Sequence, residues 1–152
     1  MHQRIILQHL PKPPRSDLTT DAYWLCDTLG LSSGRDTEDL SIRIVLRLLQ
    51  ETTSHGGIQS EALAQILGIS SGRVNHHLRN LSRSGFVYRE RKQIYLRGQS
   101  LAESVKELRK DADRIFDELE KVATEIDEIV GLRIAHKGHE ESRALIPRNP
   151  YP

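Results

Sequence analysis

Apolar residues recur at helical spacing in the middle of the chain and predict a series of helices. The first helix of this middle region is expected to begin at Asp36 and to run to about Thr52. It carries two apolar stripes, one of Ile42, Val45, Leu46 and Leu49 and one of Leu40, Ile44 and Leu48. A helix that is apolar on two sides is buried on two sides. We therefore expect one side to meet a small core and the other to meet an N-terminal helix or a second subunit.

Two further helices follow and are predicted to be joined by a tight turn at Gly68. Ser60 is expected to cap the first of them, whose buried face is formed by Ala62, Leu63, Ile66 and Leu67. The second carries an apolar stripe of Val74, Leu78 and Leu81, at spacings of four and three. Helix, tight turn and helix in this order is the plan of a helix-turn-helix.

The side of the second helix that lies opposite its apolar stripe carries long hydrogen-bond donors. They are Arg73, His76, Arg79, Asn80 and Arg83. A helix that is apolar on one side and rich in donors on the other fits the major groove of DNA. Arg73, His76 and Asn80 are predicted to contact base edges, because residues near the start of such a helix are the usual base readers.

The remaining candidates on this surface have supporting roles. The predicted phosphate contacts are Ser70, Ser71, Arg79 and Arg83. Gly72 lets the backbone approach DNA closely, and Asn75 belongs to the same candidate DNA-binding surface. His77 lies nearer the apolar edge, so we expect it to be half buried and structural.

A basic two-stranded ribbon is predicted directly after these helices. Residues 86–90 and 93–97 are rich in β-branched and aromatic residues, with Arg91 and Lys92 between them. The pattern indicates a hairpin, although Arg-Lys is not a preferred two-residue turn and a longer loop stays open. A hairpin in this place is the wing of a winged helix, and its candidate contacts to phosphates or to a minor groove are Arg89, Arg91, Lys92 and Arg97. Tyr88 and Tyr95 are expected to pair across the strands, and Ile58 to add a very short strand.

A long helix with a heptad pattern is predicted next. Ser100 is expected to cap it and Gly131 to end it. Its apolar ridge alternates gaps of four and three, and consists of Leu101, Val105, Leu108, Ala112, Ile115, Leu119, Val122, Ile126 and Ile129. Such a ridge predicts a coiled coil that pairs two chains. The apolar face is widened by Ala102, Phe116, Ala123 and Val130, so we expect it to touch a partner helix and part of a subunit's body.

The predicted organisation has four parts. They are an N-terminal arm with a short helix over 1–35, a winged helix-turn-helix domain over 36–99, a dimerisation helix over 100–131 and an irregular tail over 132–152. Thr20 or Asp21 is expected to cap the short N-terminal helix, and Gly30 to end it. The expected fold class is mainly α, with the small sheet of a winged helix.

Charge is divided between segments, although the net charge is only +1. Residues 70–98 hold seven Arg or Lys against one Glu, a balance of +6. Residues 101–131 hold ten Asp or Glu against five Lys or Arg, a balance of −5. The basic run coincides with the predicted helix and ribbon, which favours a nucleic-acid contact over a merely solvated face. No apolar run is long enough for a signal peptide or a membrane span, so a cytoplasmic location is expected.

Little in the sequence indicates metal or catalytic chemistry. The lone Cys26 excludes an intrachain disulfide and a multi-cysteine metal site, and is expected to be a buried small hydrophobe. His136 and His139 lie three apart, as zinc ligands can, but a polar tail shows this spacing by chance. No metal and no cofactor is therefore predicted. Phosphate-loop and dinucleotide glycine patterns are absent, and the chain is not expected to be an enzyme.

The most specific run of residues is Ser-Ser-Gly-Arg-Val-Asn-His-His-Leu-Arg-Asn-Leu at 70–81, followed by Ser-Gly-Phe-Val at 84–87. It resembles the Ser-x-x-x-Val-Ser-His-His-Leu-x-x-Leu…Gly-Leu-Val run of ArsR-like winged helix-turn-helix transcriptional regulators of the archaeal type, with Asn75 replacing a serine. The resemblance covers about residues 36–101. It implies homodimers whose terminal helices pair and whose recognition helices enter successive major grooves. Metal-sensing members carry a cysteine pair in the helix before the turn, and residues 61–67 contain none.

These patterns together predict a sequence-specific regulator that binds double-stranded DNA as a homodimer. Pairing through the long helix would place two recognition helices roughly 34 Å apart, as a palindromic site requires. One alternative is a protein-interaction module built from a winged helix and a coiled coil. Another is a nonspecific nucleic-acid or chromatin binder. The Arg-rich face favours DNA over protein, and equal affinity for random duplexes would indicate nonspecific binding.

Overall fold

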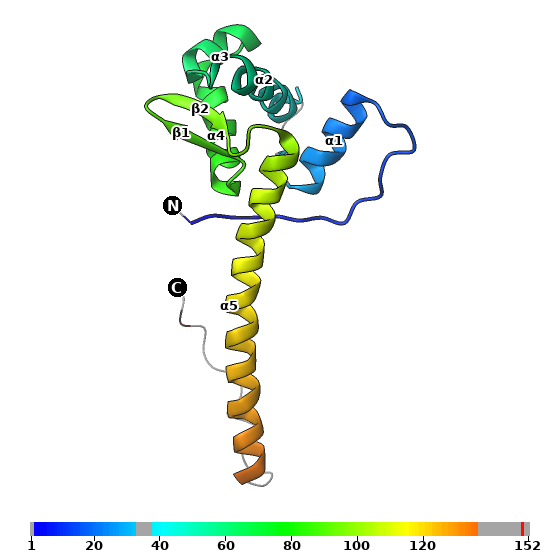
Figure 1. Ribbon diagram of the computed structural model, residues 1–152, viewed down its shortest axis with the longest axis vertical. Coiled ribbons are helices and arrows are strands. Elements are labelled where there is room, and N and C mark those ends of the chain that lie inside the picture. The colour runs from blue at the N-terminus through cyan, green and yellow to red at the C-terminus, as the bar shows by residue number, and fades with distance from the viewer. Residues whose placement is uncertain (1, 33–37, 137–149, 151–152) are drawn as a thin grey trace. The chain divides into compact units, whose positions relative to one another are not determined.

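The computed structural model describes residues 2–32, 38–136 and 150, with the backbone alone described for His55 and residues 132–136. The chain divides into two compact units, Met1–Ala112 and Asp113–Pro152. The first unit contains α1 (Leu18–Thr28), α2 (Leu40–His55), α3 (Ser60–Leu67), α4 (Ser71–Ser84), β1 (Val87–Glu90), β2 (Gln93–Leu96) and the start of α5 (Leu101–His136) (Figure 1). The rest of α5 and Pro150 form the described part of the second unit. The mainly helical fold with a small antiparallel sheet and a long last helix is as predicted.

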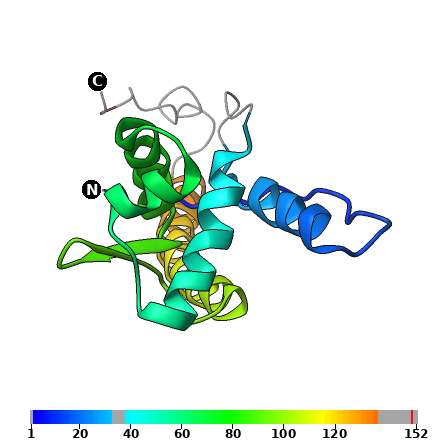
Figure 2. The ribbon, with the colours of Figure 1, turned by 90° about the horizontal axis from the view of Figure 1, so that it is seen from above.

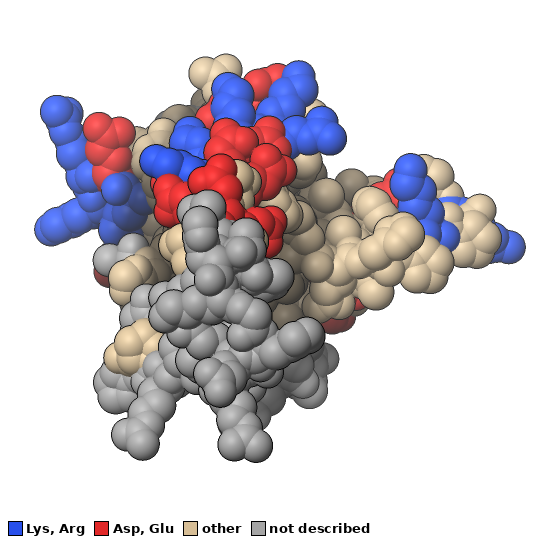
Figure 3. All heavy atoms as spheres, turned by 90° about the horizontal axis from the view of Figure 1, so that it is seen from below, with Lys and Arg blue, Asp and Glu red and all other residues tan. Residues whose placement is uncertain are grey.

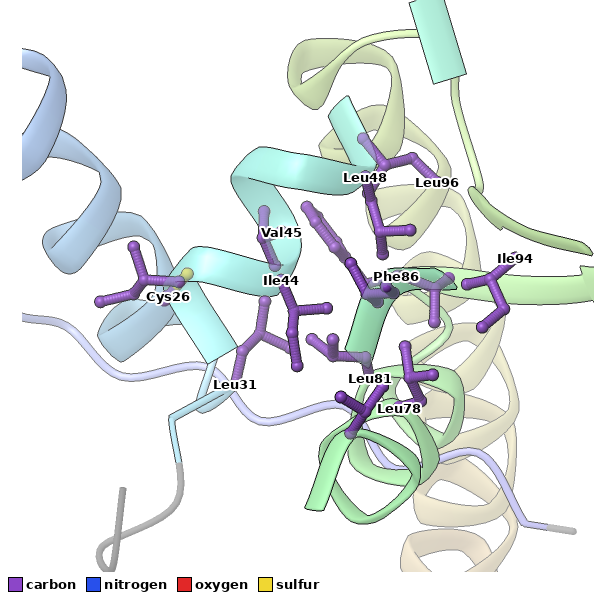
Figure 4. Packing of buried hydrophobic residues seen from close by; sticks show 14 of the residues in the cluster. Cys26, Leu31, Ile44, Val45, Leu48, Leu78, Leu81, Phe86, Ile94 and Leu96 are labelled. Carbon is purple, nitrogen blue, oxygen red and sulfur yellow. The ribbon is translucent and has the colours of Figure 1, made fainter. Parts of the chain in front are cut away.

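The core of the first unit forms around α2 and Phe86. Phe86 is fully buried, and it lies among Ile44, Leu48 and Leu81 (Figure 4). The opposite side of α2 meets α1, where Cys26 is 1% exposed. In Figure 2, α2 accordingly lies between α1 on one side and α3, α4 and the hairpin on the other. The prediction of a helix buried on two sides is confirmed, and the N-terminal helix covers the second side.

Several helix ends differ from the predicted ones. Asp17, not Thr20 or Asp21, caps α1, because its carboxylate accepts a hydrogen bond from the backbone N–H of Thr20 at 2.8 Å. Gln59 is the N-cap of α3, and Ser60 is its first helical residue. Asp36 lies outside the described residues.

The long helix α5 begins where it was predicted to begin but ends later than predicted. Ser100 caps α5 as expected, since its hydroxyl accepts from the N–H of Glu103 at 3.1 Å. Gly131 does not end the helix, which continues to His136. A single glycine inside a helix costs only about 1 kcal/mol, which by itself does not end a long helix.

The turn between α3 and α4 follows the predicted plan, with one exception on α3. Gly68 adopts a left-handed conformation with φ of 69°, and Ala64 is 4% exposed where the helices meet. Ile66, predicted to be buried, is 47% exposed. The buried arc of α3 consists of Ser60, Leu63 and Ala64, and Ile66 lies off this arc.

The predicted hairpin is present, with its shortest possible loop. Tyr88 pairs with Tyr95 in the register of β1 and β2, and their rings stack with centroids 5.1 Å apart. Arg91 and Lys92 form a two-residue turn with φ of 50° and 67°, which matches the twist of a tight hairpin but is unusual for side-chain-bearing residues. Ile58 adds the expected short strand as a bridge to Ile94.

The N-terminal arm is fastened to the end of α4. The backbone N–H of Arg4 donates to the carbonyl of Arg83 at 2.8 Å, and the side-chain amide of Gln3 donates to the carbonyl of Ser84 at 3.2 Å. The last carbonyls of a helix have no partner within the helix. Here the arm supplies two of the missing donors.

A buried carboxylate on α5 joins the arm to the base of the hairpin. Asp111 is 3% exposed, accepts from Gln3 at 2.7 Å and binds both terminal nitrogens of Arg97. The hydrogen bond to Asp111 is the main cause that raises the pKa of the Arg97 guanidinium. Arg97 was predicted to contact DNA. Its guanidinium is engaged by Asp111 within the fold, and the DNA contact stays a prediction.

The first turns of α5 also change the interpretation of the apolar ridge. Leu108 is 4% exposed and packs in the core of its own chain, with Leu101 partly buried against it. These two members of the predicted dimerisation ridge are therefore core residues. From Ile115 onward the described ridge residues are exposed in the single chain.

None of the described helices is long and apolar enough to cross a bilayer.

Replacing Asp111 with Ala is expected to lower the free energy of unfolding by about 2–4 kcal/mol, because Arg97 and Gln3 both lose their hydrogen bonds to this buried carboxylate. Asp113, two residues further along the same helix, is exposed, and its replacement by Ala should change stability by less than about 0.5 kcal/mol. Urea denaturation followed by circular dichroism, at one protein concentration, measures both. Equal stability of the two variants would contradict the structural role of Asp111.

Candidate nucleic-acid interface

Helix α4 is fixed at both ends and along one side. Ser70 caps its start, with the hydroxyl accepting from the N–H of Arg73 at 3.3 Å, and Gly85 ends it with φ of 88°. Val74 and Leu81 are fully buried and Leu78 is 3% exposed. Ser70 was predicted to contact phosphate, and its capping role was not predicted, although a serine directly before a helix is a signal for it.

Burial of this stripe turns the donors of α4 outward, as predicted. The exposed residues of the candidate surface are Ser70, Ser71, Gly72, Arg73, His76, Arg79, Asn80 and Arg83. Asn75 is only partly exposed. A Cβ atom added at Gly72 would meet no other atom within 4 Å, so the fold itself does not require glycine there.

His77 is more buried than the expected half. It is 7% exposed, and its Nδ1 lies 3.1 Å from the hydroxyl of Ser41 on α2. The ring of His76 meets it edge to face, with centroids 5.5 Å apart. The two adjacent histidines therefore lie in different environments: His77 contacts α2 through Ser41, and His76 faces outward.

Arg73 has an acidic neighbour that sequence analysis missed. Its Nη2 lies 3.2 Å from Oε2 of Glu38, which precedes α2. The pair is half exposed, at 49% and 52% of the two side chains. The two residues are far apart in sequence, so no local pattern indicates the contact.

The hairpin carries the second part of the basic surface. Arg89, Arg91 and Lys92 are exposed at its end. Figure 3 shows a lobe of mainly Lys and Arg at its left edge, on the side where Figures 1 and 2 place the hairpin. The positive-φ turn projects Arg91 and Lys92 from the end of the ribbon.

An open groove runs between the hairpin and α4, with the start of α3 as its third side. Its lining residues are Ser60, Glu61, Gly72, Asn75, Leu78, Arg79, Ser82, Val87, Tyr88 and Arg89. Two arginines, Arg79 and Arg89, lie on it from different elements. This arrangement can bind the anionic backbone of a nucleic acid, while the exposed face of α4 extends beyond the groove.

Among the side chains that the structure describes, no cluster of three potential metal ligands occurs. The candidates His136 and His139 fall outside those side chains.

Comparison with known proteins agrees with this geometry. The family model described as winged helix-turn-helix DNA-binding matches residues 39–88. The match covers α2, α3, α4 and the beginning of β1. No curated protein and no solved structure matches the chain. The matched region is a winged helix-turn-helix, and DNA is the partner that this domain indicates.

The two histidines provide a test of this geometry. His77→Ala is expected to lower the free energy of unfolding by about 1–3 kcal/mol, because the contact with the Ser41 hydroxyl is lost and a buried ring is removed. His76→Ala should change it by less than about 0.5 kcal/mol, because the ring is exposed. Thermal and urea denaturation measure both variants. A reversed order of the two effects would contradict the described orientation of α4.

Proposed function

We propose that the chain is a homodimeric, sequence-specific transcriptional regulator of the ArsR-like type, which places α4 in the major groove of double-stranded DNA. The supporting observation is the outward row of Arg73, His76 and Asn80 on a helix whose other side is buried. The similarity of residues 70–81 to the ArsR-like run supports the subtype. The function is one of binding, with no catalytic step.

Base reading is assigned to Arg73, His76 and Asn80 on the exposed side of α4. Arg73 suits guanine and Asn80 suits adenine, because each matches the hydrogen-bonding edge of its base in the major groove. Arg79 and Arg83 on α4, with Arg89, Arg91 and Lys92 on the hairpin, are assigned to phosphates. Phosphate contacts set affinity and position, while base contacts set sequence preference.

Dimerisation is assigned to the ridge of the second unit, with a second copy of the chain as its occupant. Its large apolar residues are each 42% to 56% exposed, namely Ile115, Phe116, Leu119, Val122, Ile126 and Ile129. Burying the exposed halves of these side chains on two helices contributes on the order of 10 kcal/mol. This free energy is comparable to the translational and rotational cost of bringing two chains together. The unbroken heptad spacing supports a partner helix with the same repeat, which a second copy supplies.

Base reading is tested by selecting bound duplexes from a random library and comparing the selected sequence with a scrambled one. The wild-type protein should prefer the selected duplex. Arg73→Ala should lose about 1–3 kcal/mol of discrimination at one base pair, because a bidentate base contact is removed. Equal affinity of the wild-type protein for both duplexes would favour nonspecific binding instead.

The hairpin is tested by the salt dependence of binding. Arg91→Ala with Lys92→Ala should weaken binding to every duplex and should flatten the slope of log K against log salt by about 0.9 for each lost phosphate contact. Lys106→Ala, which removes an exposed charge from α5, is the matched control and should leave the slope unchanged. An unchanged slope in the double variant would remove the hairpin from the interface.

The ridge is tested by light scattering after size exclusion. The wild-type protein should have twice the mass of one chain. Leu119→Glu with Ile126→Glu should give monomers, because a charge cannot be buried unpaired in a helix interface. Thr124→Glu adds the same charge on the opposite side of the heptad and should stay dimeric. A monomeric wild-type protein would contradict the proposed dimer, and any DNA binding would then be by single chains.

A further inference from the structure

The ion pair between Glu38 and Arg73 puts a carboxylate inside the proposed DNA-binding surface. Arg73 lies in the first turn of α4, and its Nη2 is 3.2 Å from Oε2 of Glu38. Both side chains remain about half exposed, at 49% and 52%. A negative charge at this position repels the phosphates of any duplex that approaches α4.

The backbone beside Glu38 is firmly held. Asp39 follows it and has φ of 55°, a left-handed conformation that is uncommon for residues other than glycine. The hydroxyl of Tyr23 on α1 donates to the Asp39 carboxylate, and the N–H of Arg43 donates to the Asp39 carbonyl at 3.0 Å. Contacts from α1 and α2 thus hold Asp39, the residue that follows Glu38.

Arg73 can serve two partners at once. A guanidinium has five N–H donors in a planar fork, and a carboxylate on one edge leaves other donors for a base. An arginine without such a neighbour turns equally well to a phosphate, which is present in every sequence. A held arginine presents its remaining donors in one direction.

We propose that Glu38 is a positioning residue for sequence recognition, which orients Arg73 toward base edges and disfavours binding to duplexes that lack the matching base. This inference rests on the proposed function, because it requires Arg73 to read DNA. Glu38 lowers affinity for random DNA more than it lowers affinity for the preferred site. The ratio of the two affinities is therefore the quantity that depends on it.

The test replaces Glu38 with Gln in the full chain and measures dissociation constants for the library-selected duplex and for a random duplex of equal length. Glu38→Gln should tighten binding to the random duplex roughly two- to fivefold, the size of an exposed ion pair. Binding to the selected duplex should change less, so the specificity ratio should fall by a similar factor. Because Glu38 is 52% exposed, the variant should fold as the wild-type protein does, which its thermal unfolding checks.

Two further variants separate orientation from simple charge. Glu103→Gln removes an equal charge from an ion pair on α5, where Glu103 pairs with Lys106 and is 53% exposed, and should leave the specificity ratio unchanged. Adding Glu38→Gln to Arg73→Ala should not lower the ratio further, because Glu38 then has no arginine to orient. An unchanged ratio in Glu38→Gln, an equal fall in Glu103→Gln, or an equal fall without Arg73 would each overturn the inference.

The proposed function can fail separately. If the wild-type protein binds the selected and the random duplex equally well, base reading is wrong and this inference falls with it. If the wild-type protein discriminates and Arg73→Ala reduces that discrimination, the proposed function stands, and only the response to Glu38→Gln decides about Glu38.

Discussion

The burial of one narrow stripe on α4 is the constraint on which the candidate interface depends. Val74, Leu78 and Leu81 are within 3% of complete burial, and they leave the helix no freedom to rotate about its axis. Residues at other angles of the helix are therefore held outward. Rotating α4 by one residue would bury an arginine and expose a leucine, at a cost of several kcal/mol. The orientation of the donors is thus a consequence of the core.

The same helix is also held at its C-terminal end by residues distant in sequence. The arm supplies donors for the carbonyls of Arg83 and Ser84, and Gln3 reaches on to Asp111. Asp111 in turn holds Arg97 at the base of the hairpin. One buried carboxylate therefore relates three parts of the first unit: the arm, the hairpin and the start of α5. Because the hairpin and α4 form two sides of the groove, this network also maintains the shape of the candidate interface.

The order of the elements and the outward face of α4 could be predicted from sequence because both follow from local periodicity. Val74, Leu78 and Leu81 recur at helical spacing, and the residues of opposite angle are then exposed whatever the tertiary structure is. Helix starts were predicted less well. Asp17, Thr20 and Asp21 are all able to cap α1, and the choice among them depends on which φ and ψ the preceding chain adopts.

Charged residues show the limit of such reasoning most clearly. Arg97 and Arg89 both belong to the basic run, yet only Arg97 meets a buried carboxylate, and that carboxylate lies 14 residues further along the chain. Glu38 and Arg73 are farther apart still. A sequence records the charge of each residue but not its partner, because ion pairs between elements follow from the packing of apolar faces and not from charge patterns.

The heptad ridge of α5 is the case where one uniform pattern covers residues in two different environments. Leu101 and Leu108 keep the repeat because they pack in the core of their own chain. Leu119 and Ile126 keep the same repeat but are 56% and 54% exposed in the single chain. A core and the proposed dimer interface both call for apolar residues at the same spacing, so the sequence shows one continuous ridge. A helix that began as a core element and continued as an interface would need no break in its pattern, which is why periodicity alone predicted one dimerisation helix over its whole length.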